Sequence, residues 1–174
     1  LLDRVAVPVL SSRGSQDIAA DSKYYYGYVG SHGTRYSNYI LSKCDLIISV
    51  GNRLAFPLNS MSFAPVFKKA ELIRVDIDEN EFLRRINTSK NIKADAESFL
   101  KTLAVKKAFP QIKTDWINTC TVIKNELQEF DCTDPVLALA DYMAEDSSAT
   151  VYVADVGNNE FWVSRAYEKI KPKA

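Results

Sequence analysis

The chain has 174 residues, of which 47% are hydrophobic and 25% are charged, so it is long enough to bury a core of its own. Lys plus Arg and Asp plus Glu both number 22, and a formal charge of zero gives no overall field that would attract nucleic acid or an anionic membrane. The apolar runs are also far shorter than the ~20 residues of a membrane-spanning helix. We therefore expect no partnership with nucleic acid or membrane.

The cysteines give a hint about the compartment. Cys44, Cys120 and Cys132 form no CxxC pair, and an odd number cannot all pair within one chain. We expect reduced, mostly structural thiols and a cytoplasmic protein. Because the chain opens without a methionine and stops just after a helix-like segment, we also expect it to be a piece of something longer.

Four apolar, β-branched runs predict strands that are buried on both faces of a parallel sheet. They cover residues 5–10, 46–50, 72–77 and, much later, 150–155. Helix-like segments separate them, and alternating strands and helices imply right-handed crossovers. The expected fold class is α/β with a parallel sheet.

Two helices are predicted among these strands. Residues 34–43 place Tyr36, Tyr39 and Ile40 on one face, and Asp95 is a predicted N-cap. The helix that Asp95 begins would pack Phe99, Leu100 and Leu103.

A Lys-rich stretch that contains Pro110 separates this unit from the rest of the chain. We therefore predict a domain over 1–104, a linker over 105–114 and the start of a second domain over 115–174. Asp134 and Pro135 supply an N-cap and a first-turn proline for a helix in the last part. Two apolar helix faces are expected there: Trp116, Cys120, Ile123, Leu127 and Phe130, then Val136, Leu139 and Met143.

A glycine-rich turn precedes the helix over 34–43. Gly27, Gly30 and Gly33 recur every three residues, which lets the backbone approach a phosphate or ribose at a helix N-terminus. Tight-turn glycines that serve only packing explain the pattern as well. His32, the sole histidine, is better explained as a hydrogen-bonded turn residue than as a ligand contact, and with scattered cysteines it gives no zinc spacing.

Polar residues follow two of the predicted strands. Gly51 and Arg53 come after the strand over 46–50, at the sheet edge where α/β proteins bind ligands. Asp76 lies at the end of the next strand and could accept hydrogen bonds from ribose hydroxyls. The alternative is a loop arginine that pairs with a nearby acid.

A second candidate turn lies near the end of the chain. Residues 153–162 run from a strand through Gly157 into a helix, and such a turn directs unpaired helix-start amides at an anion. An ordinary strand-to-helix connection would look the same. The sequence holds no nucleophilic triad, Walker loop or basic-aromatic patch.

Five segments resemble, in order and spacing, the central domain of acetolactate synthase catalytic subunits. They are VPVLSS, GYVGSHGTRYSNY, CDLIISVGNRL, FAPVFKKAELIRVDID and IKADAESFL. The likeness covers about residues 1–103. The later VYVADVGNNEFWVSRAYEKIKP resembles the opening strand and helix of the domain that binds the cofactor diphosphate in that thiamine-diphosphate family. The resemblance implies a Rossmann-like central domain followed by part of a second α/β domain.

The resemblance also implies an enzyme that uses thiamine diphosphate and Mg²⁺ to decarboxylate pyruvate or another 2-keto acid and transfer the two-carbon unit to an acceptor. The family's glutamate and its Gly-Asp-Gly metal motif are expected outside these residues. We therefore expect no catalytic residue and no metal ligand here, and an inactive fragment. The full-length form is expected to be a homodimer or homotetramer.

The resemblance assigns two sets of binding residues. Val156, Gly157, Asn158 and Asn159 occupy the family's Val-Gly-Gln-His turn for thiamine diphosphate, where Asn158 can still donate and Asn159 lacks the ring nitrogen. In relatives with FAD, the flavin contacts would correspond to Gly30, Ser31, His32, Gly51, Arg53, Asp76, Ile77 and Asp95.

One departure from the family pattern bears on the flavin. Ala55, Phe56 and Pro57 replace the acidic pair and the second arginine that, in the family, usually follow the arginine matched by Arg53, and this predicts weak flavin binding or none.

A different class of function, a non-catalytic nucleotide-binding module of nicotinamide-domain type, is the alternative. Such a module has no need of a second diphosphate turn around Gly157. A purely structural or subunit-contact fragment would not explain two ligand-suited turns.

Overall fold

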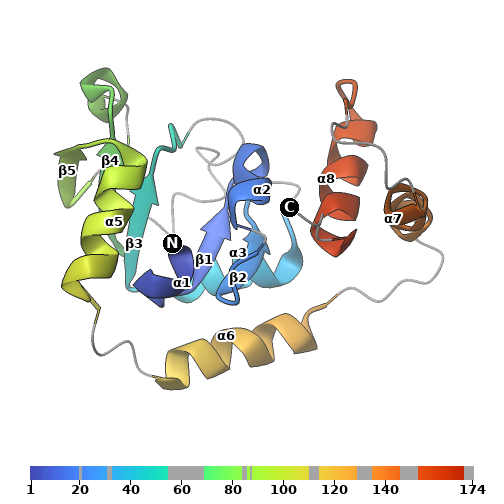
Figure 1. Cartoon of the computed structure of the whole chain (residues 1–174), viewed down its shortest axis with the longest axis horizontal. Coiled ribbons are helices and arrows are strands. Elements are labelled where there is room, and N and C mark those ends of the chain that lie inside the picture. Colours follow the sequence, from blue (N-terminus) through green and yellow to red (C-terminus); the bar gives the residue numbers. More distant parts are fainter. Residues whose placement is uncertain are drawn as a thin grey trace.

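The computed structural model describes residues 1–19, 21–30, 33–54, 69–83, 86, 88–109, 114–128, 135–145 and 153–170, with backbone only at 18, 114, 135–137 and 167–170. In these residues the protein is a mixed α/β structure (Figure 1). Its helices are α1 (Leu2–Val5), α2 (Gln16–Ala19), α3 (Arg35–Lys43), α5 (Ala96–Lys106), α6 (Thr114–Glu126), α7 (Pro135–Glu145) and α8 (Asn158–Ile170), with 3₁₀ turns η1 (Arg13–Ser15) and η2 (Glu79–Leu83).

The strands pair in parallel, as the alternation of strands and helices predicts. β1 (Val9–Ser11) pairs with β2 (Tyr25–Tyr28). A second sheet has the order β3-β4-β5, with β3 (Leu46–Val50), β4 (Glu71–Asp76) and β5 (Lys90–Lys93). Its register pairs Val50 with Val75 and Asp76 with Lys93, so the carboxyl ends of all three strands lie along one edge.

The first predicted strand is only partly right. Residues 2–5 form α1, and the strand begins at Val9 rather than at Val5. Ala6 ends the helix in the left-handed conformation with φ 57°, and Pro8 has no amide proton to give to a ladder. An apolar run that reads as one strand is therefore divided by backbone geometry.

The helix predicted over 34–43 is present as α3, but its buried face differs from the prediction. Tyr36 and Ile40 are buried as expected, whereas Tyr39 is 44% exposed. Ser37 and Leu41 are buried in its place. Ser37 Oγ donates to the Tyr28 carbonyl, so a polar residue lies where the helix meets β2.

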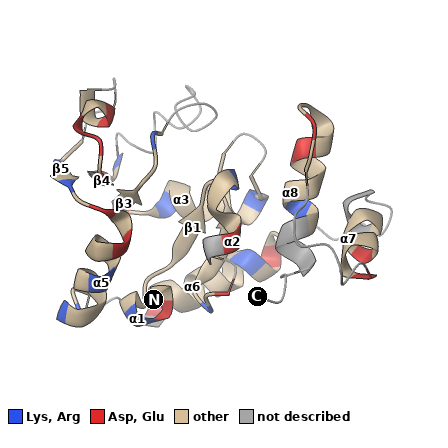
Figure 2. Ribbon diagram, turned by 45° about the horizontal axis from the view of Figure 1, so that its top comes forward, with Lys and Arg blue, Asp and Glu red and all other residues tan. Residues whose placement is uncertain are grey.

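Asp95 is the N-cap of α5, as predicted, and its Oδ1 accepts from the Ser98 amide at 2.9 Å. Acidic Glu97 lies in the first turn and basic Lys106 in the last, which complements the helix dipole. Figure 2 shows this acidic-to-basic order along α5.

α6 follows the predicted linker and packs on the preceding unit. Cys120 of α6 is fully buried in one cluster with Tyr26 of β2 and Ile40 of α3, and Trp116 and Ile123 pack against it. Trp116, Cys120 and Ile123 of the predicted apolar face are therefore confirmed. Phe130, its last predicted member, lies outside them. The predicted domain boundary itself stays a prediction.

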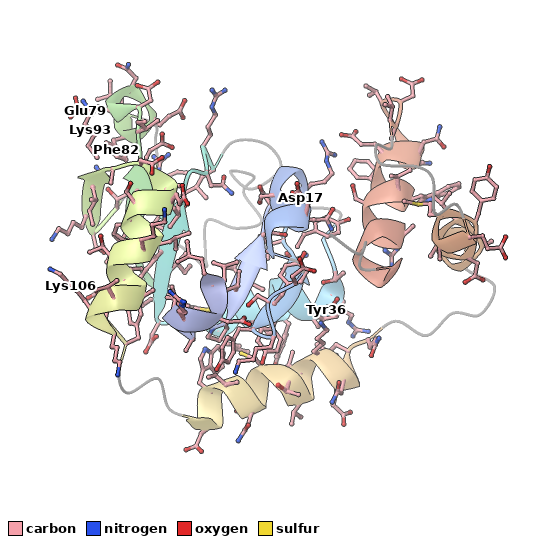
Figure 3. All side chains as sticks on the ribbon, viewed as in Figure 1. Asp17, Tyr36, Glu79, Phe82, Lys93 and Lys106 are labelled. Carbon is pink, nitrogen blue, oxygen red and sulfur yellow. The ribbon has the colours of Figure 1, made fainter. Side chains whose placement is uncertain are left out.

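Lys124 attaches the second half of α6 to the sheet. Its Nζ donates to the Tyr25 carbonyl at 3.3 Å and lies 6.0 Å from the ring centroid of Tyr26 and 5.5 Å from that of Tyr36. Figure 3 shows Tyr36 on the side of α3 that faces α6. One ammonium group thus joins α6 to both β2 and α3.

α7 and α8 pack against each other through Ala140, Met143 and Ala166, with Leu139 and Val163 beside them. The start of α7 at Pro135 agrees with the predicted first-turn proline, whereas Asp134 lies outside the described residues. The strand predicted over 150–155 is described only from Val153 onward, and residues 153–155 belong to no strand. Within the described ranges, no helix is both long and apolar enough to cross a membrane.

Replacing Lys124 by Met should lower the free energy of unfolding by about 1–2 kcal/mol, because a partly desolvated cation between two aromatic rings is lost together with a hydrogen bond. Urea denaturation followed by circular dichroism measures this change. Lys43→Met is the matched control, since Lys43 lies 4.9 Å from the ring of exposed Tyr39. An equal loss in both variants would contradict the special role of Lys124.

Candidate functional site

The carboxyl edge of β3, β4 and β5 brings several predicted binding residues together. Gly51, with φ 60°, donates its amide to the Val75 carbonyl at 2.9 Å. A Cβ on Gly51 would lie 3.9 Å from the Ala96 side chain, at the start of α5. The Ala94 amide in turn donates to the Asp76 carbonyl at 3.0 Å. Backbone bonds therefore hold Gly51, Asp76 and the start of α5 at one place.

Arg53 is at this edge, but its guanidinium has a partner within the chain. Its side chain is 72% exposed, and Nε lies 3.3 Å from Oε1 of Glu81, whose side chain is buried. The alternative of a loop arginine paired with a nearby acid therefore describes Arg53 in this structure. The acid is Glu81 of η2, a position that no motif in the sequence marks.

Arg74 lies beneath this pair and is 1% exposed. Its Nη1 donates to the Glu81 carbonyl at 2.6 Å and its Nη2 to the Arg53 carbonyl at 3.4 Å. Its guanidinium also lies 5.8 Å from the Phe82 ring centroid. Arg74 thus joins the loop after β3 to the turn after β4. In the sequence, this role of Arg74 is indicated by the position of a charged residue inside an apolar strand.

Asp76 and Asp95 both use a carboxylate oxygen to stabilise their own turns. Asp76 Oδ1 accepts from the Asp78 amide at 3.0 Å, and Asp95 Oδ1 caps α5. Hydrogen bonds from Ser98 hold the pKa of Asp95 below its usual value, with the charge of Lys101 a smaller cause. Ile77 is exposed beside them. Figure 3 shows the neighbouring Glu79, Phe82 and Lys93 at the same end of the sheet.

The glycine-rich turn is fastened to α3. Gly30, with φ 136°, donates its amide to Asn38 Oδ1 at 3.1 Å, and Asn38 Nδ2 donates back to the Gly30 carbonyl at 2.9 Å. The Gly33 amide donates to the same carbonyl at 3.0 Å. The predicted site residues Ser31 and His32 lie outside the described residues.

Gly33 supports the packing explanation for one of the three glycines. A Cβ there would lie 2.5 Å from the Tyr28 carbonyl oxygen and 2.8 Å from the Gly30 nitrogen, both backbone atoms that cannot move aside. The turn is therefore so tight that only glycine fits at this position.

The glycine-rich turn and the loop after β3 share one core. Val29, which precedes Gly30, and Leu54, which follows Arg53, lie in the same buried cluster with Leu41 and Leu72. Hydrophobic packing therefore connects the two candidate nucleotide-binding segments. The positions of Ala55, Phe56 and Pro57, on which the flavin prediction depends, lie outside the described residues.

The turn predicted to bind a diphosphate has an open, helix-starting geometry. Gly157 has φ 119°, and nothing lies within 4 Å of a Cβ built on it. α8 begins at the next residue, Asn158, and Val156 and Asn159 are exposed. The start of a 13-residue helix has amides without intrahelical partners. All four predicted residues, Val156, Gly157, Asn158 and Asn159, therefore lie on one accessible turn.

The described cysteines are free thiols in protected positions. Burial, and to a smaller degree the charge of Asp45, raises the pKa of Cys44 to about 11. Burial, then the neighbouring Cys44, raises the pKa of Cys120 to about 12. Both therefore stay protonated near neutral pH, as structural thiols do. No three His, Cys, Asp or Glu side chains of the described ranges are grouped so that they could hold a metal ion.

The sequence of the chain is similar to those of known proteins. The family described as "Thiamine pyrophosphate enzyme, central domain" matches residues 1–103. The probable acetolactate synthase large subunit of Methanocaldococcus jannaschii is 24% identical over 190 residues, which cover 100% of this chain and 32% of that protein. The acetolactate synthase isozyme 2 large subunit of Escherichia coli K12 is 27% identical over 170 residues, 92% of this chain and 29% of that protein. The chain thus spans about a third of the length of these curated relatives.

Gly33→Ala should lower the free energy of unfolding by about 1–3 kcal/mol, because the new methyl group overpacks a turn made of backbone atoms. Gly14→Ala is the matched control, since no atom lies within 4 Å of a Cβ on Gly14. That change should alter stability by less than about 1 kcal/mol. Thermal and urea denaturation of the two variants provide the comparison. A Gly33→Ala protein as stable as the control would show that the turn can widen.

Proposed function

Because the chain belongs to the thiamine pyrophosphate enzymes, whose central domain matches residues 1–103, we propose that it is part of a thiamine-diphosphate-dependent lyase or carboligase of the acetolactate synthase type. The proposed reaction decarboxylates pyruvate or another 2-keto acid and transfers the two-carbon unit to an acceptor. The observation that carries the proposal is the order of the parts. A matched central domain is followed, beyond α6, by a glycine turn at the start of α8.

The turn at Gly157 fits the diphosphate end of the proposed cofactor. Its positive φ and the open space around it let the backbone approach an anion closely. The first amides of α8 point toward that side of the helix, and the helix dipole favours negative charge there. Asn158 adds a side-chain donor at the first helical position.

Thiamine diphosphate, when bound, supplies the group that stabilises the negative charge left when a 2-keto acid loses carbon dioxide. The role proposed for this chain is binding and orientation. The amides near Gly157 and the Asn158 side chain would hold the diphosphate, and α8, packed on α7, would fix its direction. A rigid anchor of this kind limits the positions that the reacting end can occupy.

Mg²⁺ is proposed as the second cofactor, as in the family that the sequence resembles. Its protein ligands, and the glutamate of the reaction, are proposed to lie outside the 174 residues, so this chain by itself should be inactive. We also propose a cytoplasmic homodimer or homotetramer for the full-length protein, without nucleic acid or membrane as partner.

The carboxyl edge of the sheet fits a flavin only in part. Gly30 and Gly51 have the positive φ values of close-approach turns. Three of the predicted polar contacts, however, already serve the chain: Arg53 pairs with Glu81, Asp76 bonds the Asp78 amide, and Asp95 caps α5. Glu81 already neutralises part of the charge of Arg53, so a phosphate group would gain less from this guanidinium than from an unpaired one. This supports weak FAD binding or none.

Gly157→Val in the full-length protein should raise the thiamine diphosphate concentration for half-maximal activity well over tenfold, since a loss beyond ~1.4 kcal/mol already gives that factor. A branched side chain disfavours the φ of 119° and blocks the approach of the diphosphate. Asn158→Ala should weaken binding less, because the helix-start amides remain. Cofactor titration with circular dichroism as a folding check decides. A folded Gly157→Val enzyme that saturates like wild type would show that the diphosphate binds elsewhere.

The full-length protein should purify colourless, because the polar groups predicted to contact FAD are engaged within the chain. Each such charged hydrogen bond contributes about 1.5–3 kcal/mol, so their diversion would weaken flavin binding strongly. Absorbance near the flavin bands, measured before and after dialysis against FAD, tests this. A yellow protein with stoichiometric flavin would show that Gly30, Gly51 and the remaining contacts suffice.

A further inference from the structure

Arg13 connects the beginning of the chain to the start of α8. It lies in η1, directly before α2, and Figure 1 shows α2 beside α8. Its Nη2 forms an ion pair with Glu160 Oε1, and its guanidinium lies 5.6 Å from the ring centroid of Phe161. The two charged side chains are 41% and 28% exposed. This pair is therefore partly shielded from water and held in place by an aromatic ring.

Gln16 makes a second contact one helical turn further along. Its Nε2 donates to the Ser164 carbonyl at 3.2 Å, and Gln16 is buried. Glu160 and Ser164 are four residues apart and lie on one face of α8, where Ser164 Oγ also donates to the Glu160 carbonyl at 2.9 Å. The segment from Arg13 to Gln16 therefore fixes the rotation of α8 about its axis.

Glu160 occupies a sensitive position. It is the third residue of α8, and the residue before the helix is Gly157. A glutamate at the third helical position commonly folds back to accept from the amide of the residue that precedes the helix. In this chain that amide belongs to Gly157, in the turn proposed for the diphosphate. Glu160 is thus an internal anion able to compete with the cofactor for the same donor.

We propose that Arg13 is a positioning residue for this turn, which holds the Glu160 carboxylate away from the Gly157 amide and so keeps that helix start available to an anionic diphosphate. This inference rests on the proposed function. The ion pair also neutralises a negative charge that would otherwise lie within one turn of the diphosphate, where it opposes an anion. Arg13 acts through Glu160, so its effect should disappear when the carboxylate is removed.

The test measures thiamine diphosphate affinity of the full-length protein by calorimetry in the presence of Mg²⁺. Arg13→Gln should raise the Kd roughly three- to tenfold, the range expected for a charge near a helix start. Glu160→Ala alone should change the Kd less than about twofold. The double variant should return to within about twofold of wild type. Arg13→Lys, which keeps the charge, should retain most of the affinity. A double variant as weak as Arg13→Gln would overturn the proposal.

Amide hydrogen exchange without cofactor gives a second readout, whose sign separates positioning from simple loosening. If Glu160 is released in Arg13→Gln and caps the helix, exchange at residues 157–160 should slow. If Arg13 only fastens α8, exchange along the helix should accelerate, and that result would overturn the proposal. Lys101→Gln, which breaks the exposed Lys101–Glu97 pair on α5, is the matched control and should change neither the Kd nor exchange in α8.

The two levels of proposal fail in different ways. If wild-type protein shows no affinity for thiamine diphosphate, the proposed function falls and this inference falls with it. If wild type binds and Gly157→Val weakens binding, but folded Arg13→Gln binds as well as wild type, only the role of Arg13 is refuted.

Discussion

The buried guanidinium of Arg74 is the interaction on which the candidate nucleotide-binding edge depends. A charge in the protein interior is costly unless hydrogen bonds replace its water shell. Arg74 meets part of this requirement, because Nη1 and Nη2 donate to the carbonyls of Glu81 and Arg53, which belong to two different connections. The loop after β3 and the turn after β4 are consequently held at a common position. Arg53 and Glu81 then pair above it, so the shape and the charge of this edge have one origin.

Single charged side chains also contribute to the contacts between the later helices and the first unit. For α6 a charged group adds to the apolar cluster around Cys120, and for α8 a charged pair reaches back to the first unit. Lys124 links α6 to β2 and α3, and Arg13 links η1 to α8. Each cation lies against an aromatic ring, which restrains a long side chain at small desolvation cost. Such contacts hold α8 at a defined rotation about its axis, and that rotation sets which of its side chains face η1 and α2.

The interpretation of the edge of the sheet changes with these contacts. By the family resemblance, Arg53, Asp76 and Asp95 would correspond to flavin contacts. In the folded chain, however, each of these three side chains already forms a hydrogen bond or an ion pair with another part of the chain. These side chains can serve as the family pattern implies only if a bound nucleotide interacts with them more strongly than their partners within the chain do. Glu81, buried and close to Arg53, is one of these internal partners.

The sequence by itself determined the parallel α/β class, β3 and β4, the cap at Asp95, the apolar face of α6 and the glycine turns, because these depend on local periodicity and on the conformational preferences of single residues. It missed β2 and β5, whose sequences YYGY and KNIK lack an apolar β-branched run, and it extended β1 across Pro8 and the left-handed Ala6. It also placed Tyr39 inside, since helical spacing identifies a face but not its exact orientation.

Only the tertiary structure decided which side chains pair with one another. Arg53 with Glu81, Arg74 with two carbonyls, Lys124 with Tyr36 and Arg13 with Glu160 join residues 7 to 147 positions apart in the chain. No local pattern encodes such partners, because a charged side chain has many possible neighbours until packing selects one. The sequence names the groups capable of binding an anion, and the fold decides which of them are already engaged.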